Sequence, residues 1–348
     1  MDTTPPCVPA ALTARVRATA YALESEFGSR PFHVDEAMSI GVAHDRVVRA
    51  CGAGAFHRLG GGWYASAAVA GDQLARAEAK LWVLHRNNPG VVACGRSAAA
   101  IWGLPLPPVP EPTARASVDM AGAGLEVAFV SGSGGLRGQR GDVLARRWSV
   151  PEDHVTRGPR GEPVTDPLRT AIDVTRGCSL ALALGPLDAA LRLTLSRGTP
   201  VEEGIRSLRT RCADLAGGHG VSIVARAIPH ADARAESPLE SLVRGRIIEA
   251  GLPVPCLQVP LVGASGRRYR ADMAMDLPGA PEGSYRLLIE ADGLSKYARV
   301  EDLAEEKRRQ HDLERQGHVF VRVLFREALW SPATFTDEIS RRLDTSRA

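Results

Sequence analysis

The N-terminal region places hydrophobic residues at helical spacing. One apolar stripe runs through the first predicted helix, residues 8–27, and consists of Leu12, Val16, Ala20 and Leu23. Two shorter helical patterns follow at 33–41 and 43–54, and glycines can end both of them. Two β-like runs then flank the glycine triplet at 60–62, which is a hairpin signal. The pattern therefore predicts three helices followed by a hairpin.

This order of elements is typical of a winged helix-turn-helix, a DNA-binding fold. In that arrangement Val47 and Val48 pack inward. The residues expected to contact DNA are His44, Arg46 and Arg49, which would face the major groove, and Arg58, which would lie on the wing near phosphate. The alternative is a small helical cap whose arginines are only solvated.

The middle region, residues 69–232, mixes helical and strand-like patterns. A helical run covers 72–89, and another helix begins at Pro167, because proline is favoured at the first helical position. Alternating runs between 114 and 155 predict a few antiparallel strands. The polar stretch 229–236 is the expected linker to the last domain.

The C-terminal region, residues 233–348, carries the clearest element order. A helix starts after the N-cap Ser237 and ends near Gly251, and three strand-like runs, a charged helix and a further strand follow it. Side chains alternate along a strand, so Glu290 and Asp292 share one face of the third strand. The region is predicted to be an αβββαβ core.

Two carboxylates in this core fall on consecutive strands, Asp272 on the second and Glu290 on the third. If the strands are neighbours, the carboxylates converge and repel each other unless a cation joins them. Hard oxygen ligands of this kind suit Mg²⁺ or Mn²⁺. Such an ion can lower the pKa of an attacking water and neutralise a leaving oxygen, which is the chemistry of phosphodiester hydrolysis.

Each acidic residue also has a structural interpretation. Glu240 lies three residues after Ser237 and can complete a capping box. Asp272 can form a surface ion pair with Arg267 or Arg270, and Asp292 can shape the turn that follows it.

Four ordered motifs, "SPLESLV", "RADMAM", "LLIEADG" and "EEKRRQHDLERQGHVFVRV", resemble the DUF559 domains. These are relatives of the very-short-patch-repair endonucleases in the PD-(D/E)XK superfamily. The resemblance covers Ser237 to about Phe325 and implies a metal-dependent nuclease core. It implies that the ligands are Asp272 and Glu290, with Asp292 as third acid and Glu240 as the acid of the first helix.

The chain departs from that family at two positions. Asp292 stands where the wider superfamily often has lysine, and Lys296 stands where DUF559-like sequences have histidine. Lys296 either stabilises the pentavalent phosphate or is a surface lysine. Arg309 either approaches phosphate or pairs with Glu305, four residues earlier.

The N-terminal segment 8–66, which ends in "GWYA", resembles the winged-helix domain of AbiEi-family antitoxins from type IV toxin–antitoxin systems. The stretches "RSAAAIWGLPL" and "VTDPLRTAIDV" resemble the segment that follows it in those proteins. We interpret both stretches as packing motifs.

Composition adds little to this picture. The net charge of +3 neither demands nor excludes nucleic acid, and the six cysteines show no zinc spacing. No apolar run approaches the ~20 residues of a membrane span, and the first residues do not resemble a secretory signal. We therefore expect a cytoplasmic protein without a membrane partner.

Together these features predict an α+β or α/β multidomain protein, divided at 1–68, 69–232 and 233–348. The expected function is a Mg²⁺- or Mn²⁺-dependent DNA endonuclease that its N-terminal domain targets, in phage defence or DNA repair. The alternative is a non-catalytic DNA-binding transcriptional regulator of the AbiEi antitoxin kind with a degenerate nuclease fold. RNA stays open as a substrate, because neither motif reads the 2′-hydroxyl, and a homodimer is left open.

Overall fold

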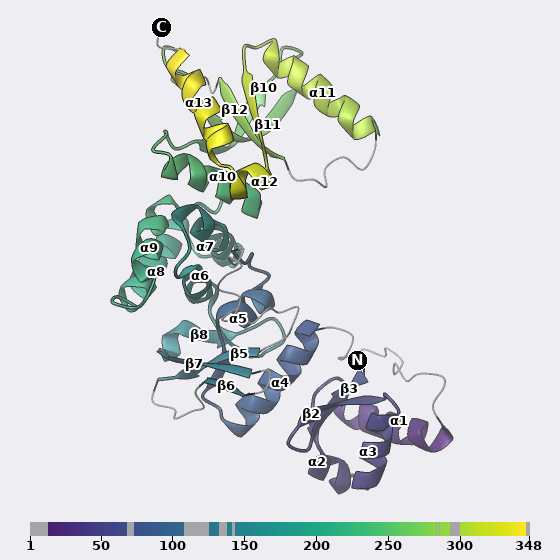
Figure 1. The fold of residues 1–348 in the computed structure, drawn as a ribbon. Coiled ribbons are helices and arrows are strands. Elements are labelled where there is room, and N and C mark those ends of the chain that lie inside the picture. The colour runs from purple at the N-terminus through teal and green to yellow at the C-terminus, as the bar shows by residue number, and fades with distance from the viewer. Residues whose placement is uncertain are drawn as a thin grey trace. The chain divides into compact units, whose positions relative to one another are not determined.

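The computed structural model describes residues 13–67, 73–107, 125–131, 138–140, 143–282, 284, 286–292 and 300–345. The chain forms two compact units, one of residues 1–103 and 110–166 and the other of residues 104–109 and 167–348. Both units combine helices with β-sheet (Figure 1). The predicted mixed α/β, multidomain organisation is therefore confirmed, while the three-domain division stays a prediction.

The N-terminal part of the first unit contains three helices and a three-stranded sheet (Figure 1). The helices are α1 (Ala14–Phe27), α2 (Val34–Ser39) and α3 (His44–Gly52). The sheet has the order β1-β3-β2, from β1 (Phe32–His33), β2 (Phe56–Gly60) and β3 (Trp63–Ser66). The predicted helices and hairpin are present within the described residues, and the short strand β1 is an addition.

An aromatic cluster forms the core of this part. Phe32 stacks on Phe27 at 4.9 Å between ring centroids and meets Phe56 edge-on at 5.4 Å. Val47 is fully buried, but Val48 is 47% exposed. The prediction that both valines pack inward is wrong for Val48, because neighbouring helix positions differ by about 100° in direction.

The rest of the first unit is built on a six-stranded sheet of order β6-β7-β5-β4-β9-β8. Its strands are β4 (Val91–Ala93), β5 (Leu125–Val130), β6 (Gly138–Arg140), β7 (Val143–Val150), β8 (Val155–Arg157) and β9 (Pro163–Thr165). The accompanying helices are α4 (Gln73–Asn87), α5 (Gly95–Trp102) and the 3₁₀ turn η3 (Glu152–His154).

Strand directions in this sheet differ from the prediction. The β5–β7 and β4–β9 pairs are parallel, and the remaining pairs are antiparallel. The predicted set of antiparallel strands is thus only partly right, because side-chain alternation is the same in both kinds of pairing.

The second unit opens with a group of helices. These are α6 (Pro167–Thr175), α7 (Leu180–Leu195), α8 (Val201–Ala213), α9 (Val221–Ala227) and the 3₁₀ turn η4 (Ile228–His230). Helix α7 packs on α10 (Pro238–Glu249) so closely that a Cβ atom on Gly245 would overlap Ala181.

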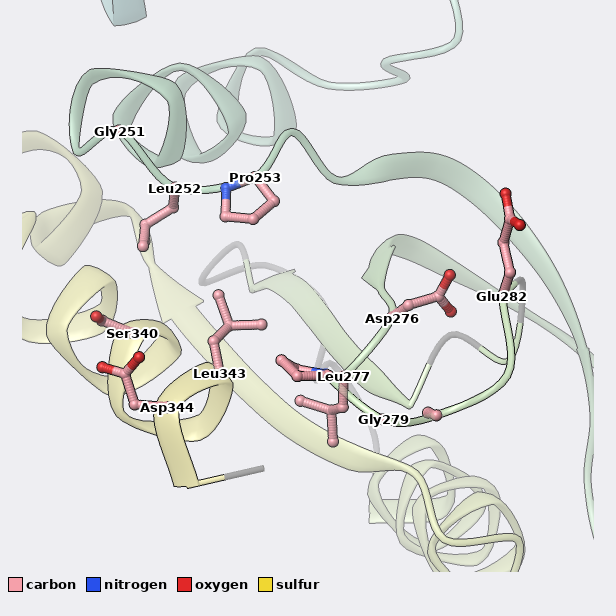
Figure 2. A pocket seen from close by; sticks show the side chains of 12 residues that line it. Gly251, Leu252, Pro253, Asp276, Leu277, Gly279, Glu282, Ser340, Leu343 and Asp344 are labelled. Atoms are coloured by element: carbon pink, nitrogen blue, oxygen red, sulfur yellow. The ribbon is translucent and has the colours of Figure 1, made fainter. Parts of the chain in front are cut away.

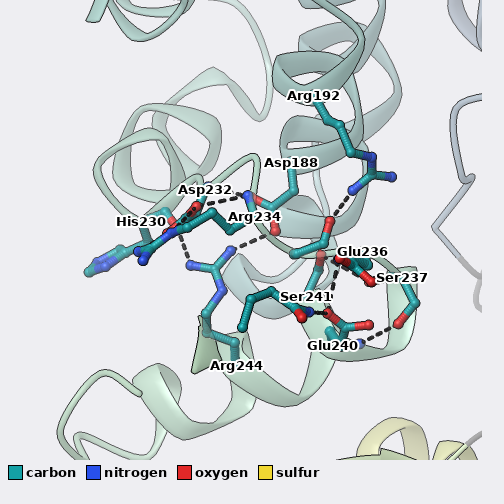
Figure 3. A network of polar contacts seen from close by, with 12 residues as sticks. Asp188, Arg192, His230, Asp232, Arg234, Glu236, Ser237, Glu240, Ser241 and Arg244 are labelled. Atoms are coloured by element: carbon teal, nitrogen blue, oxygen red, sulfur yellow. Dashed lines mark hydrogen bonds and ion pairs between the residues drawn. The ribbon is translucent and has the colours of Figure 1, made fainter. Parts of the chain in front are cut away.

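The expected linker 229–236 is packed against these helices rather than extended in solvent. Ala235 is fully buried, and its carbonyl accepts a hydrogen bond from Arg192 (Figure 3). The N–H of Asp232 donates to Asp188 Oδ1 at 2.7 Å. The segment therefore joins α7 to α10 as part of the packed structure.

The C-terminal sheet has the order β10-β11-β12-β13. Its strands are β10 (Cys256–Val262), β11 (Arg268–Met275), β12 (Leu287–Asp292) and β13 (Val319–Leu324). The β10–β11 and β11–β12 pairs are antiparallel, whereas β13 runs parallel to β12. The helices around them are α11 (Val300–Glu314), α12 (Phe325–Trp330) and α13 (Ala333–Thr345).

Buried apolar residues cover both faces of this sheet. One core joins Met273, Ile289 and Val321 with residues of α10 and α13. The other joins Ala271 and Leu288 with residues such as Leu313 of α11. Among the described residues, no helix is both long and apolar enough to cross a membrane.

Candidate active site

One row of polar residues crosses the C-terminal sheet. The pairs Leu257↔Met273 and Val259↔Ala271 flank Gln258, which therefore lies opposite Asp272. The pairing of β11 with β12 ends at Met273↔Ile289, so Asp272 and Glu290 are the next residues along the two strands, and Glu290 pairs with Arg322 on β13. Each strand thus contributes one member of the row, which consists of Gln258, Asp272, Glu290 and Arg322.

Asp272 lies against the backbone of the neighbouring strand. Its Oδ2 accepts a hydrogen bond of 3.2 Å from the N–H of Ala291. Arg270, one of its expected ion-pair partners, instead pairs with Glu236 at 2.8 Å. The two predicted carboxylates, Asp272 and Glu290, therefore lie on adjacent strands in one row.

Glu290 is held by an arginine from α11. Arg309 Nη2 donates to Glu290 Oε1 at 2.7 Å, and Nη1 donates to Oε2 at 3.1 Å. Arg309 also contacts Glu306 at 3.2 Å and the carbonyl of Arg270 at 3.0 Å. The acidic partner of Arg309 on its own helix is thus Glu306 rather than the predicted Glu305.

The charge of Arg309 is stabilised where it stands. Burial opposes its charged form, but the hydrogen bonds and charges of Glu290 and Glu306 outweigh burial and raise the pKa of Arg309. Arg322 also donates to Glu306, at 2.8 Å. The carboxylates of Glu290 and Glu306 therefore balance the two guanidinium groups of Arg309 and Arg322.

Glu240 connects α10 to the first strand of the sheet. Its own N–H donates to Ser237 Oγ at 3.1 Å, so Ser237 is the N-cap as predicted. The Glu240 carboxylate accepts from the N–H of Glu236 and from Gln258 Nε2, both at 2.9 Å. Only 5% of Glu240 is exposed, and Gln258 holds it next to the row.

The remaining predicted site residues are placed only in part. Asp292 ends β12, where it pairs with Leu324 of β13, and it is half-buried. Lys296 lies outside the described residues, so its predicted role stays a prediction.

The donor types at the row fit a hard divalent cation, since carboxylate oxygens are the ligands that Mg²⁺ and Mn²⁺ prefer. Among the described residues, no three His, Cys, Asp or Glu side chains are grouped to hold a metal ion. Both oxygens of Glu290 already accept hydrogen bonds from Arg309. A cation would therefore share Glu290 with Arg309 or replace it there.

A separate open cavity lies where α10 ends. It has a volume of about 630 Å³, and its lining includes Leu252, Asp276 and Leu343 (Figure 2). No residue of the polar row lines it. The cavity is thus distinct from the candidate site.

The predicted DNA-contacting residues all lie on exposed positions of the first unit. His44, Arg46 and Arg49 are exposed on α3, and Arg58 is exposed on β2. Arg49 forms an ion pair with Asp45, four residues earlier. Its charge is therefore partly neutralised, and Arg46 and His44 are left as the more available groups of this helix.

Two residues of the row, Gln258 and Arg322, were not predicted from the sequence. The available signal was their place in β-runs of alternating residues at the level of Asp272 and Glu290. Using that signal requires the pairing register of four strands, and the sequence alone does not provide it.

No protein-family model matches the chain. Two relatives from Mycobacterium tuberculosis, the uncharacterized protein MT2308 of strain CDC 1551/Oshkosh and the uncharacterized protein Rv2248 of strain ATCC 25618/H37Rv, are each 30% identical over 187 residues. The match covers 54% of this chain and 64% of each relative. The chain thus spans less than two thirds of the length of these relatives.

One solved structure, that of the RV2827C protein from Mycobacterium tuberculosis, is similar to this chain, and the match covers 74% of this chain and 87% of that protein's chain. The identity is 14% and the TM-score is 0.39.

Proposed function

We propose that the C-terminal region, residues 233–348, is a PD-(D/E)XK-type nuclease core that hydrolyses DNA phosphodiester bonds with Mg²⁺ or Mn²⁺. The proposal is carried by one observation: Asp272 and Glu290 belong to the adjacent strands β11 and β12, and the Asp272 carboxylate accepts a hydrogen bond from the N–H of Ala291, the residue after Glu290. Two carboxylates at such positions are stabilised when a positive charge joins them.

The order of elements supports the same proposal. Along the chain, helix α10 is followed by the antiparallel strands β10, β11 and β12, then by helix α11 and by the parallel strand β13. In the sheet the strands lie in the order β10-β11-β12-β13. This is the αβββαβ order that the DUF559 resemblance implies. Glu240 belongs to the first helix, Asp272 to the second strand and Glu290 to the third.

Residues of the chain have distinct roles in this proposal. Asp272, Glu290 and Asp292 would hold the divalent cation, which when bound lowers the pKa of a water and neutralises charge on phosphate. Glu240, fixed by Gln258 and the N–H of Glu236, would orient the attacking water. Arg309 would turn from Glu290 to a non-bridging phosphate oxygen.

The N-terminal region, residues 1–68, would serve as a winged helix-turn-helix that holds the DNA. The exposed positions of His44, Arg46 and Arg58 support this role. The middle region, residues 69–232, would connect the two functional domains. Targeting by a DNA-binding domain is compatible with phage defence or DNA repair.

One observation favours a second function. Arg309 already neutralises Glu290 through two hydrogen bonds, so this carboxylate needs no cation in the present arrangement. A core of this kind would suit a non-catalytic DNA-binding regulator of the AbiEi antitoxin type, in which the nuclease fold is degenerate.

The two functions are separated by incubating the protein with supercoiled plasmid and Mn²⁺. The variants are Asp272→Ala and Glu290→Ala, with Glu282→Ala as a control, because Glu282 is an exposed carboxylate outside the row. Nicking by the wild type and the control, lost in both row variants, supports the nuclease. Plasmid that is retarded in a gel but never cut supports the regulator.

A further inference from the structure

Gln258 occupies an unusual backbone conformation in the middle of β10. Its φ angle is +54°, and no other non-glycine residue in the described ranges has a positive φ. The flanking pairs Leu257↔Met273 and Val259↔Ala271 keep the same register, so no residue is inserted at this point. The strain is therefore borne by Gln258 itself.

The conformation changes which face of the sheet the strand covers. In a regular strand, residues i and i+2 share a face. Leu257 instead belongs to the core on the α10 side, and Val259 belongs to the core on the α11 side. Met273 and Ala271 of β11 divide in the same way. Along β10 and β11, the buried side chains therefore change from one face of the sheet to the other at the level of Gln258 and Asp272.

The side chain of Gln258 uses this twist to reach α10. Its Nε2 donates to Glu240 Oε2 at 2.9 Å. The opposite amide orientation would put two oxygens against each other, so the carboxylate determines which end carries the nitrogen. Within the described part of the chain, Gln258 Oε1 is buried and accepts no hydrogen bond.

A buried acceptor without a partner is costly and calls for an explanation. A strained backbone that presents such an acceptor is a second cost at the same residue. Both occur at one end of the row that contains Asp272 and Glu290. Packing alone accounts for neither, because an apolar side chain would avoid the first cost and glycine would avoid both.

We propose that Gln258 is a positioning residue of the candidate site. Its amide nitrogen holds the Glu240 carboxylate, and its Oε1 accepts a hydrogen bond from a water that hydrates the divalent cation. Mg²⁺ and Mn²⁺ sites fit such a role, because these ions keep several waters when bound to proteins. The inference rests on the proposed metal-dependent function and names the residue that orders its water.

Three substitutions separate the amide from the backbone conformation. Gln258→Gly accepts a positive φ without strain, Gln258→Ala does not, and Gln258→Asn tolerates it with a side chain too short to reach Glu240. Mn²⁺ affinity is measured for each by electron paramagnetic resonance of the free ion, and thermal unfolding is followed in parallel. Val262→Ala, at an exposed position of the same strand, is the control.

If the amide acts as proposed, all three variants bind Mn²⁺ about tenfold more weakly than wild type, while Gln258→Gly unfolds at a higher temperature than Gln258→Ala. The control matches wild type. Wild-type Mn²⁺ affinity in Gln258→Gly overturns the proposal, because only the backbone would then matter.

A metal-free exchange tests the contact with Glu240. In the double variant Glu240→Gln with Gln258→Glu, amide and carboxylate change places, and the hydrogen bond can form again. We expect this double variant to unfold at a higher temperature than either single variant, and strictly additive shifts would contradict the contact.

If wild type binds no Mn²⁺, the proposed function fails together with the role of Oε1. If wild type binds Mn²⁺ and the Gln258 variants match it, only the present inference fails.

Discussion

Arg309 and Glu290 form a two-point ion pair between α11 and β12, with donor–acceptor distances of 2.7 and 3.1 Å. The side chains of Arg309 and Glu290 are 16% and 13% exposed, so water screens the pair only partly. The pair joins the helix to the row in which Asp272 lies. It thus occupies the carboxylate on which the nuclease proposal depends.

Replacing Arg309 by methionine separates two roles of Glu290, as the ion-pair partner of Arg309 and as the proposed ligand of the divalent cation. Without a cation, Glu290 loses its main partner, and we expect a loss of about 2–4 kcal/mol in the free energy of unfolding. If Glu290 is a ligand, Mn²⁺ restores much of that loss, because it supplies the missing positive charge. Urea unfolding with and without Mn²⁺ measures both effects.

The matched control is Arg341→Met, since Arg341 is 73% exposed in its pair with Glu338. We expect a change under about 1 kcal/mol there, with no response to Mn²⁺. An Arg309→Met protein that Mn²⁺ does not stabilise would count against Glu290 as a ligand and in favour of the regulator.

The buried pair between Asp188 of α7 and Arg244 of α10 is expected to be sensitive to pH. The two side chains are 1% and 3% exposed and meet at 2.6 Å (Figure 3). Burial raises the pKa of Asp188, although Arg244 and the Asp232 N–H favour its charged form. Arg244→Met would leave that charge unpaired, at a cost of about 3–5 kcal/mol at neutral pH.

The cost in Arg244→Met should shrink as the pH falls. A carboxyl whose folded-state pKa exceeds its unfolded-state value destabilises the fold above the unfolded-state pKa, near 4, and the penalty disappears below it. Urea unfolding at pH 7, 5 and 4 measures the trend. Adding Asp188→Asn to the variant should remove the pH dependence, and a deficit that stays constant with pH would show that Asp188 is not its source.

The close contact of α7 and α10 predicts unequal effects for two glycines. A Cβ atom on Gly245 would overlap the backbone of Ala181, so Gly245→Ala should cost about 1–3 kcal/mol or more. A Cβ atom on Gly185, inside α7, would lie 3.9 Å from the side chain of Pro105. The ring of Pro186, the next residue in the helix, opposes the gain in helix propensity that alanine brings. Gly185→Ala should therefore change the stability by less than about 1 kcal/mol. Equal thermal stability of the two variants would contradict this packing.

Asp312 fastens α11 to the β10–β11 turn. Its carboxylate accepts from the Ser265 N–H at 2.8 Å, from Ser265 Oγ at 2.5 Å and from the Tyr269 hydroxyl at 3.1 Å. The hydrogen bond from the Ser265 side chain is the main reason that the pKa of Asp312 is lowered.

A lowered carboxyl pKa stabilises the fold above the unfolded-state value, and that contribution is lost as the pH falls through the folded-state value. The wild type should therefore lose stability below about pH 4, and Asp312→Asn should lose less over the same range. Chemical unfolding at pH 7 and pH 3 makes the comparison. Identical acid losses in the two proteins would exclude Asp312 as a contributor.

Local signals explain why the C-terminal elements were predictable. Ser237 and Gly251 mark the two ends of one helix, and the alternation at 287–292 marks a strand. The adjacency of the strands that carry Asp272 and Glu290 followed from placing consecutive strands side by side. These inferences needed only neighbouring residues and short connections.

Features that depend on distant residues were not predictable in the same way. Arg309 lies 19 residues after Glu290, and its choice of Glu290 depends on how α11 lies on the sheet. The parallel β5–β7 pair shows the same limit, since alternation does not determine strand direction. The prediction that Val48 packs inward was wrong for a local reason, because adjacent residues of a helix point in directions about 100° apart.

The exposed surface of α3 provides the last prediction. Arg46 and Arg49 are both exposed, but Asp45 pairs with Arg49. If α3 contacts DNA, Arg46→Ala should weaken binding more than Arg49→Ala, because the Arg49 charge is already offset. Asp45→Ala should strengthen binding, since it frees Arg49 and removes a charge that repels phosphate.

Fluorescence anisotropy with labelled duplex DNA at several salt concentrations measures these effects, and the salt slope should fall by about one unit for each lost phosphate contact. Arg226→Ala, at an exposed position on α9, is the control. Equal affinities for all four variants would exclude α3 from the DNA-binding surface.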